Sequence, residues 1–232
     1  MTKAVALISG GIDSPLAAYL ASRRMDIVPL HFCLNPFYCE SSFELLIESL
    51  KALRTKFPFE KIVLYPWGET ISTILHSQAR RYMCVICRRA MFKAAELICK
   101  SEEASAIVTG EALGQKASQT LQNLSATSHG VTWPILRPLI GLDKVEIQRL
   151  SRRLGVWRDK HTGCCSATPS KPATGTKVEI LDDLFEKLNI QSVIENEFTR
   201  RLEIQVRSEE DLDIAYFMAL KEIFSEKSAQ VE

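Results

Sequence analysis

Residues 4–21 read AVALISGGIDSPLAAYLA: a short apolar run, two glycines, and a longer apolar run that begins with proline. The run from Ala4 to Ile8 has the length of a buried strand and contains no charged residue. Pro15 lies where the first turn of a helix tolerates proline. The order of strand, tight loop and helix is the opening of a βαβ unit, and it predicts an α/β protein.

The alternation of strand-like and helix-like segments continues along the chain. The further expected strands are 27–32, 61–65 and 106–109, and the expected helices are 43–57, 69–80, 85–100, 116–124 and 142–154. This order predicts a doubly wound parallel sheet. Such sheets bind ligands beyond the carboxyl ends of their strands, so the regions of Ser9, His31 and Gly110 are expected to meet in one pocket.

After the helix-like segments the pattern changes. Residues 157–176 are rich in Gly, Pro, Ser, Thr and Cys, which predicts an ordered loop or flap near the site. Helical spacing returns at 178–188 and 209–226, with a short strand expected at 203–206. We therefore expect a main domain over residues 1–180 and a small helical C-terminal extension over residues 181–232.

The composition is that of a folded protein without a membrane span. The 232 residues are 46% hydrophobic and 25% charged, with a net charge of +1. No apolar run approaches the ~20 residues of a spanning helix, and residues 1–3 do not open a signal peptide, so we expect a cytoplasmic protein without a membrane partner. The charge balance excludes a broad basic surface, and any contact with nucleic acid must be local.

The loop Ser9-Gly10-Gly11-Ile12-Asp13-Ser14 has the properties of a phosphate site. A strand that leads through glycines into a helix leaves backbone N–H groups pointing outward, where the helix dipole adds partial positive charge. The hydroxyls of Ser9 and Ser14 can donate to phosphate oxygens. The carboxylate of Asp13 repels phosphate unless it holds Mg²⁺ or orders the loop. A plain glycine turn capped by serine is the alternative interpretation.

This loop lacks the Gly-Lys-Ser/Thr ending of the enzymes that cleave the γ-phosphate. Its pattern Ser-Gly-Gly-x-Asp-Ser resembles the PP-loop, or N-type ATP pyrophosphatase, signature. The resemblance implies an adenine nucleotide alpha hydrolase-like fold and a reaction that splits ATP into AMP and pyrophosphate. It does not separate GMP synthetase, argininosuccinate synthetase, queuosine-pathway ligases and tRNA thiolases.

Two later segments narrow the resemblance to one family. Residues 109–124, TGEALGQKASQTLQNL, resemble the second signature of the tRNA 4-thiouridine synthetase (ThiI) family. Residues 137–144, RPLIGLDK, with Glu146 and Ile147, resemble its next block. The resemblance extends from about residue 4 to about residue 180, and the order of these blocks is more specific than any single motif.

The resemblance implies an ATP site and its chemistry. In that family the C4 carbonyl oxygen of a tRNA uridine is adenylated with release of pyrophosphate, and sulfur then displaces AMP to leave 4-thiouridine. From the residues alone, Leu7 and Phe32 are equally good core residues, and His31 can be a buried, hydrogen-bonded histidine. The implied nucleotide-binding residues are Leu7, Ile8, Ser9, Gly10, Gly11, Asp13, Ser14, His31, Phe32, Arg88, Gly110 and Gln119.

Clustered cysteines in a reducing compartment are candidates for metal binding or catalysis. Cys84 and Cys87 form a Cys-x-x-Cys pair, and Cys164 and Cys165 lie in the irregular segment where the family places its catalytic cysteine. The chain most resembles the archaeal, cluster-dependent type. This resemblance implies a [4Fe-4S] or [3Fe-4S] cluster held by Cys84, Cys87 and Cys164, with one iron open to sulfide.

Other assignments of these cysteines stay open. Cys165 is the alternative third ligand, all four thiolates could hold Zn²⁺, and Cys164 could carry a persulfide that Cys84 or Cys87 resolves. With Asp13, the three cluster cysteines are the catalytic candidates. Cys99 is expected to be a small buried apolar residue.

The expected partners are tRNA and sulfide or another sulfur donor. Relatives place a tRNA-binding THUMP region before the loop and some carry a rhodanese domain, and we expect this chain to contain neither. Residues 181–232 match nothing in the family pattern, which leaves RNA contact, a homodimer surface and docking of a separate THUMP protein as their roles. A PP-loop ligase or sulfurtransferase for a small molecule or carrier protein, and a nucleotide-binding subunit without catalysis, are the alternative functions.

Overall fold

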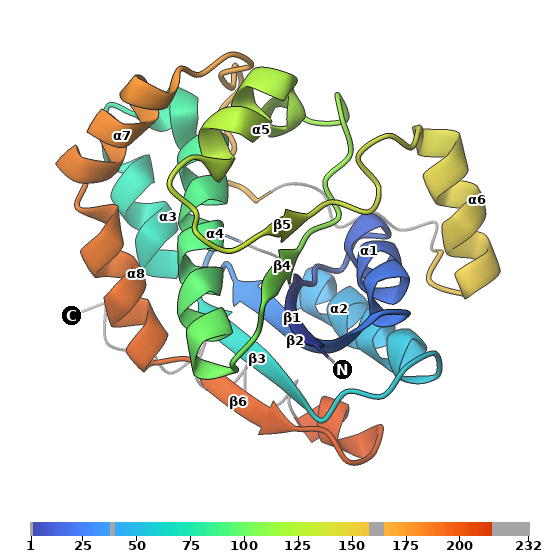
Figure 1. Ribbon diagram of the computed structural model, residues 1–232. Coiled ribbons are helices and arrows are strands. Elements are labelled where there is room, and N and C mark those ends of the chain that lie inside the picture. Colours follow the sequence, from blue (N-terminus) through green and yellow to red (C-terminus); the bar gives the residue numbers. More distant parts are fainter. Residues whose placement is uncertain (1, 38–39, 158–164, 215–232) are drawn as a thin grey trace.

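One sheet runs through the centre of the protein, and helices cover both of its faces (Figure 1). The computed structural model describes residues 2–37, 40–157 and 165–214. The strand order is β5-β4-β1-β2-β3-β6, and all neighbours are parallel except β3 and β6. The strands are β1 (Thr2–Leu7), β2 (Met25–Cys33), β3 (Lys61–Pro66), β4 (Ala106–Val108), β5 (Ile135–Leu136) and β6 (Leu202–Gln205).

Alternate residues of the strands pack against different helix layers. Ala4 and Ala6 of β1 share a core with the first layer, and Val5 and Leu7 share a core with the second. The first layer contains α1 (Asp13–Ser22), α2 (Glu40–Arg54) and α6 (Lys144–Leu154). The second contains α3 (Gly68–Leu75), α4 (Met83–Ser101), α5 (Leu121–Ser128), α7 (Val178–Lys187) and α8 (Ile190–Thr199). The predicted doubly wound α/β fold is confirmed.

Some elements differ from the predicted ones for local reasons. The helix expected over 116–124 is interrupted because Thr120 is extended, at φ −73° and ψ 155°, and its side chain accepts a hydrogen bond from the backbone N of Asn123. Thr120 is thus the N-cap, and Leu121 is the first residue of α5. Helix α8 was not expected as an element separate from α7. The two are divided by Asn189 in a left-handed conformation, with no glycine or proline to signal the break.

The C-terminal segment is built into the sheet. Strand β6 pairs antiparallel with β3, and α8 packs beside α3 and α4. The buried carboxylate of Glu197 on α8 accepts hydrogen bonds from the backbone N–H groups of Glu69 and Thr70 and from the Thr70 hydroxyl. It thereby satisfies the first turn of α3. Helix α7 crosses residue 180, where the domain boundary was expected, and that boundary remains a prediction.

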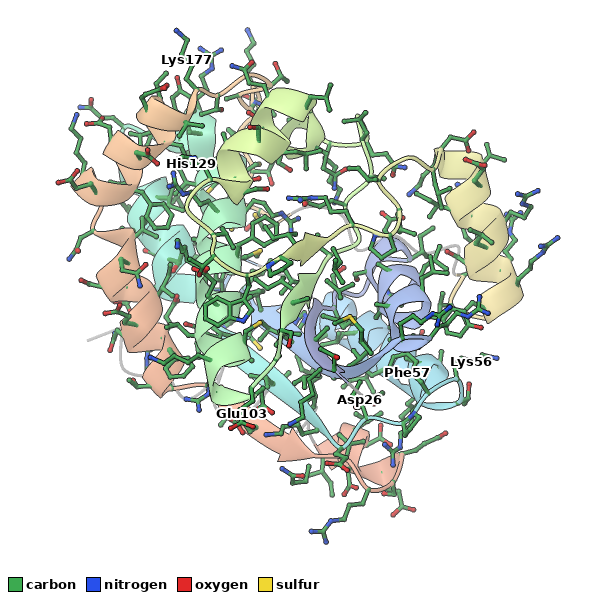
Figure 2. All side chains as sticks on the ribbon, viewed as in Figure 1. Asp26, Lys56, Phe57, Glu103, His129 and Lys177 are labelled. Carbon is green, nitrogen blue, oxygen red and sulfur yellow. The ribbon has the colours of Figure 1, made fainter. Side chains whose placement is uncertain are left out.

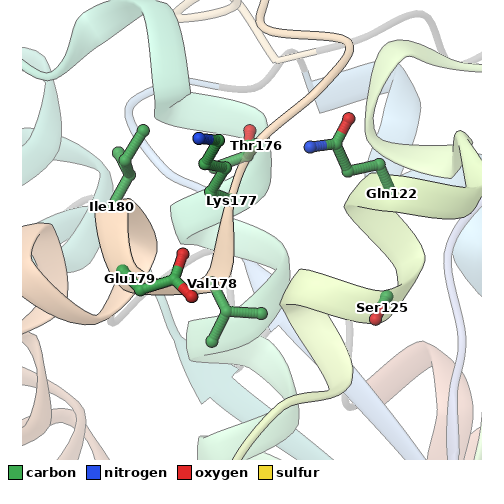
Figure 3. Close-up of a pocket in the computed structure, with 7 residues that line it drawn as sticks. All are labelled: Gln122, Ser125, Thr176, Lys177, Val178, Glu179 and Ile180. Carbon is green, nitrogen blue, oxygen red and sulfur yellow. The ribbon is translucent and has the colours of Figure 1, made fainter.

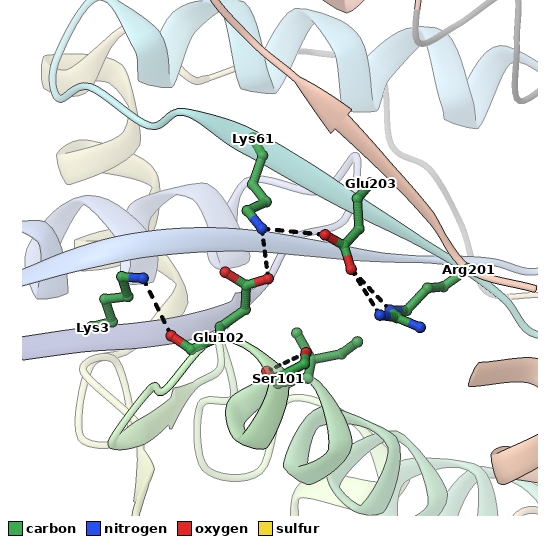
Figure 4. Close-up of polar contacts among 7 residues, drawn as sticks. Lys3, Lys61, Ser101, Glu102, Arg201 and Glu203 are labelled. Carbon is green, nitrogen blue, oxygen red and sulfur yellow. Dashed lines mark hydrogen bonds and ion pairs between the residues drawn. The ribbon is translucent and has the colours of Figure 1, made fainter. Parts of the chain in front are cut away.

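Ion pairs hold β6 in place at the edge of the sheet. Lys61 Nζ lies 2.7 Å from Glu102 Oε1 and 3.2 Å from Glu203 Oε2, and Arg201 pairs with the same Glu203 (Figure 4). The hydrogen bond from Lys61 to Glu102 is the largest cause of the raised pKa of that lysine. Figure 2 labels Glu103, the residue after Glu102, in the lower half of the view and Lys177 at its top.

Among the residues that the structure describes, no helix is both long and apolar enough to cross a membrane.

Glu197 predicts a pH dependence of stability. Burial raises the pKa of its carboxyl from 4.5 to about 7. Between these values the folded protein keeps a proton that the unfolded chain releases, so stability falls as pH rises through the window and levels off above it. Glu197→Gln should remove this pH dependence, which amounts to about 3 kcal/mol of the free energy of unfolding across the window. Urea unfolding at a series of pH values would measure it. Glu195→Gln, on the exposed side of α8, is the matched control. Identical slopes for wild type and Glu197→Gln would contradict the assignment.

Candidate active site

The predicted nucleotide residues meet in one cavity of about 150 Å³ at the carboxyl ends of β1, β2 and β4. This is the position where a doubly wound sheet binds its ligands. Of the nucleotide residues predicted, only Gly10 and Gly11 are absent from the lining. The lining residues are Leu7, Ile8, Ser9, Asp13, Ser14, His31, Phe32, Leu34, Arg88, Met91, Thr109, Gly110, Glu111, Lys116 and Gln119.

Two serines close the phosphate loop on itself. The hydroxyl of Ser14 accepts a hydrogen bond of 2.8 Å from the backbone N of Ser9, and the two hydroxyl oxygens lie 3.0 Å apart. The backbone N of Gly11 also donates to Ser9 Oγ, at 3.4 Å. Helix α1 begins at Asp13, so its first turn contains Ser14, the residue that closes the loop. Its free N–H groups and its dipole therefore face the cavity edge, as anion binding requires.

Gly110 allows β4 to approach the phosphate loop. A Cβ atom at this position would lie 2.6 Å from the backbone C of Asp13 and N of Ser14, and 2.7 Å from Ser14 Cα. Those atoms belong to the backbone and cannot rotate away. Only glycine permits this contact between the end of β4 and the start of α1.

His31 is held in a fixed direction by the strand beside it. Its Nδ1–H donates to the carbonyl of Ile8 at 2.8 Å, and burial lowers the pKa of the imidazole to about 4. The ring is therefore neutral at neutral pH. Phe32 contacts Trp67 and Tyr65 in an aromatic cluster, with ring centroids 4.5 Å and 5.4 Å away. Both residues are core residues and cavity residues at once, so their contact with ATP stays a prediction.

A buried carboxylate joins two arginines beside the cavity. Glu111 is 1% exposed, and its Oε2 accepts a hydrogen bond of 2.8 Å from Arg137 Nε. Its Oε1 lies 3.3 Å from Arg88 Nε. Arg88 was predicted as a site residue, whereas Glu111 was not. The available signal was its position in the 109–124 segment, directly after Gly110.

Lysines lie at the phosphate loop as well. Lys144 Nζ at the start of α6 lies 3.3 Å from Asp13 Oδ1, and Lys116 lines the cavity. Neither was singled out from the sequence, although both belong to the two segments that carry the family resemblance. They add positive charge beside the phosphate loop.

Three thiols gather beside the first turns of α4. Cys84 and Cys87 lie on that helix, and Cys165 lies close enough to interact electrostatically with Cys87. Burial raises the pKa of the Cys87 thiol to about 12, although a hydrogen bond from Trp67 acts in the opposite direction. Cys164 lies outside the described residues. Within 2–37, 40–157 and 165–214, no three potential ligand side chains form a metal-binding group. Cys99 is fully buried in the core, as expected.

Asn123 links the cysteine segment to the nucleotide segment. Its side-chain amide donates to the carbonyls of Ala117 and Ala173, and its carbonyl oxygen accepts from the backbone N of Thr176. The side chain is fully buried, so all three hydrogen bonds are shielded from water. Residues 165–176, which bring Cys165 to α4, are thus fixed to the segment that carries Gln119.

A second hollow, larger and more open, lies between α5 and the start of α7 (Figure 3). None of the predicted site residues lines it, and the phosphate loop is not part of it. We therefore place the candidate active site in the smaller cavity. The residues around the second hollow are Gln122, Ser125, Thr176, Lys177, Val178, Glu179 and Ile180.

The model of the family described as thiamine biosynthesis protein (ThiI) matches residues 1–190. The chain belongs to the ThiI family. A protein of Methanothermobacter thermautotrophicus named probable tRNA sulfurtransferase is 38% identical over 204 residues, which are 85% of this chain and 52% of that relative. A protein of Methanobrevibacter smithii with the same name is 38% identical over 202 residues, or 84% and 53% of the two chains. This ThiI-family chain thus spans about half the length of these relatives.

Solved structures agree with the family assignment. The crystal structure of a 4-thiouridine synthetase–RNA complex with bound ATP superposes with a TM-score of 0.81 and 32% identity. The match covers 89% of this ThiI-family chain and 55% of that chain. The U34-tRNA thiolase NcsA from Methanococcus maripaludis, solved with its [4Fe-4S] cluster, has a TM-score of 0.50 at 15% identity, with 86% and 72% covered. That second likeness concerns the fold alone.

The close approach at Gly110 predicts a strict requirement for glycine. Gly110→Ala should push β4 away from α1, lower the melting temperature and weaken ATP binding at least ~10-fold, since the added methyl group meets only backbone atoms. Calorimetric titration with ATP and thermal unfolding would measure both effects. Gly141→Ala is the control, because a Cβ there meets nothing within 4 Å. Equal ATP affinity in the two variants would disprove the role of the contact.

Proposed function

We propose that this chain carries out the ATP-dependent thiolation of uridine in tRNA to 4-thiouridine. One observation carries the proposal: Cys87 and Arg88 are neighbours on α4, so one helix reaches both the cavity and the thiols. Arg88 lines the cavity at the phosphate loop, while Cys87 lies with Cys84 and Cys165. A site that only bound ATP would need no thiols, and a sulfur carrier would need no phosphate loop. The relatives named probable tRNA sulfurtransferase support tRNA as the acceptor, and the similar structure of a 4-thiouridine synthetase–RNA complex supports uridine as the nucleotide.

The first step activates the uridine. Its O4 bonds to the α-phosphorus of ATP, the bond from that phosphorus to the β-phosphate oxygen breaks, and pyrophosphate leaves while N3 loses its proton. The N–H groups at the start of α1, the hydroxyls of Ser9 and Ser14 and the ammonium of Lys144 stabilise the charge on the phosphates. Asp13 is the carboxylate that would hold Mg²⁺ on those phosphates.

The second step replaces oxygen by sulfur. A sulfur nucleophile bonds to C4, the C4–O bond breaks, and AMP departs with the electron pair while the sulfur proton passes to N3. Cys84 and Cys87, with Cys164 from outside the described residues as the third ligand, would hold an iron–sulfur cluster, since Cys84, Cys87 and Cys165 do not form a metal-binding group in the structure. An all-thiol donor set suits iron or zinc and not Mg²⁺. When bound, such a cluster supplies an open iron that takes up sulfide. Cys87 is half-buried and packs against the apolar cluster that contains Trp67 and Phe32.

Lys144 should be required for adenylation. Lys144→Ala removes the ammonium group next to Asp13, so tRNA-dependent pyrophosphate release should slow at least ~10-fold. Lys187→Ala is the control, because that lysine is exposed and its partner among the described residues is Asp183, one helical turn away. An unchanged rate of pyrophosphate release in Lys144→Ala would remove this lysine from the mechanism.

The cysteines should be required for the second step alone. With anaerobically reconstituted protein, ATP, Mg²⁺, sulfide and tRNA, Cys84→Ala and Cys87→Ala should still release pyrophosphate but form no 4-thiouridine, as measured by nucleoside mass spectrometry. Cys99→Ala, a buried cysteine with a backbone partner at 3.6 Å, should keep both activities.

Analysis of iron, zinc and acid-labile sulfide accompanies the same samples. If the samples contain zinc but no acid-labile sulfide, the cysteines hold zinc and not an iron–sulfur cluster. Wild-type protein that releases pyrophosphate with a small molecule but never thiolates tRNA would overturn the proposed acceptor.

A further inference from the structure

Arg137 lies outside the nucleotide cavity, although its partner Glu111 lines it. Arg137 directly follows β5 and is not among the residues around the cavity, whereas Glu111 and Arg88 are. Three contacts hold its guanidinium. Its Nε donates to Glu111 Oε2 at 2.8 Å, its Nη2 donates to the Ser128 hydroxyl at 2.7 Å, and its central carbon lies 5.6 Å from the centre of the Phe92 ring. The fold, and not a ligand, therefore sets the position of this arginine.

The carboxylate of Glu111 is shared unequally between its two arginines. Its hydrogen bond to Arg137 is short, with 2.8 Å between Oε2 and Nε. Arg88 Nε lies 3.3 Å from Oε1, but this oxygen has no hydrogen-bond partner among the residues that the structure describes. Because Glu111 is almost fully buried, water does not screen the difference. The carboxylate therefore neutralises Arg137 first, and Arg88 keeps most of its positive charge.

The charge that remains on Arg88 lies where a phosphate needs it. Arg88 lines the cavity together with Ser9, Asp13 and Ser14 of the phosphate loop. It meets Glu111 through Nε, which leaves the terminal nitrogens of the guanidinium for a ligand. Carboxylates and phosphates compete for these donors, because arginine binds both in the same bidentate manner. A Glu111 without another partner would take them from the phosphates.

We propose that Arg137 is a positioning residue that occupies Glu111 and so keeps the charge of Arg88 available to the phosphates of ATP. The inference rests on the proposed function in that ATP is the ligand of the cavity. It gives a role in nucleotide binding to a residue that does not line the cavity. Since Arg137 acts only through the carboxylate, its loss should harm the binding of phosphates and leave the binding of the nucleoside intact.

The test compares ATP with adenosine, which has the same base and sugar but no phosphates. Arg137→Gln removes the charge that holds Glu111, so calorimetric titration should show an ATP affinity at least ~10-fold lower and an unchanged adenosine affinity. A distorted cavity would bind both ligands more weakly. Arg201→Gln is the matched control and should change neither affinity. Arg201 also pairs with a glutamate, Glu203, and lies over the ring of Phe198, but it precedes β6 at the other edge of the sheet.

A second substitution should reverse the loss. When Glu111→Gln is added to Arg137→Gln, no carboxylate competes for Arg88, so the ratio of ATP affinity to adenosine affinity should return at least to the wild-type value. The double variant buries no unpaired carboxylate, so it should fold even if Arg137→Gln alone does not, and thermal unfolding checks both proteins. A ratio in the double variant as low as that of Arg88→Ala would overturn the inference. A wild-type ratio in Arg137→Gln would do the same.

These titrations need neither tRNA nor the cysteines, so the inference and the proposed function can fail separately. The expected loss and recovery of ATP affinity in protein that never thiolates tRNA would uphold the inference and reject the function. If wild-type protein forms 4-thiouridine and Arg137→Gln binds ATP as tightly as the wild type, the inference alone is rejected.

Discussion

The contact between Gly110 and the backbone of Asp13 and Ser14 is the constraint on which the site depends. It joins the end of β4 to the start of α1 with no side chain between them. Because this distance is set by backbone atoms, the residues that follow Gly110 are placed as accurately as the phosphate loop itself. Glu111 is one of them, and it in turn orders Arg88 and Arg137. A fixed backbone contact therefore sets the direction of two charged side chains.

Helix α4 divides the site into a polar and a sulfur-containing half. Arg88 faces the cavity with its charge partly neutralised by Glu111, whereas Cys87 lies in the apolar cluster that contains Trp67 and Phe32. The cavity side of α4 thus carries paired charges, whereas the side of Cys87 packs among apolar residues, where electrostatic interactions are less screened. Asn123 connects both halves, because it binds the segment of Gln119 and the segment after Cys165.

The sequence was most informative where local geometry and chemistry coincide. The strand, the glycines and the helix around Ser9 predicted both the fold and the place of the cavity, and the spacing of Cys84 and Cys87 put them on one turn. Glu111 and Lys144 were missed because their importance arises from partners 23 and 131 positions away, Arg88 and Asp13. The break at Asn189 was missed because a left-handed asparagine leaves no composition signal. Long-range pairing, unlike periodicity, cannot be read from neighbouring residues.

The antiparallel strand β6 has a consequence for biosynthesis. It is the last of the described strands to leave the ribosome, and until it emerges the outer edge of β3 has unpaired backbone groups and Lys61 has only one of its two carboxylate partners. An open strand edge is a template for pairing with other chains. The nascent protein therefore passes through a period in which the residues that line the cavity have been synthesised but the edge of β3 is still exposed. Chaperones can protect such an edge until β6 pairs with it.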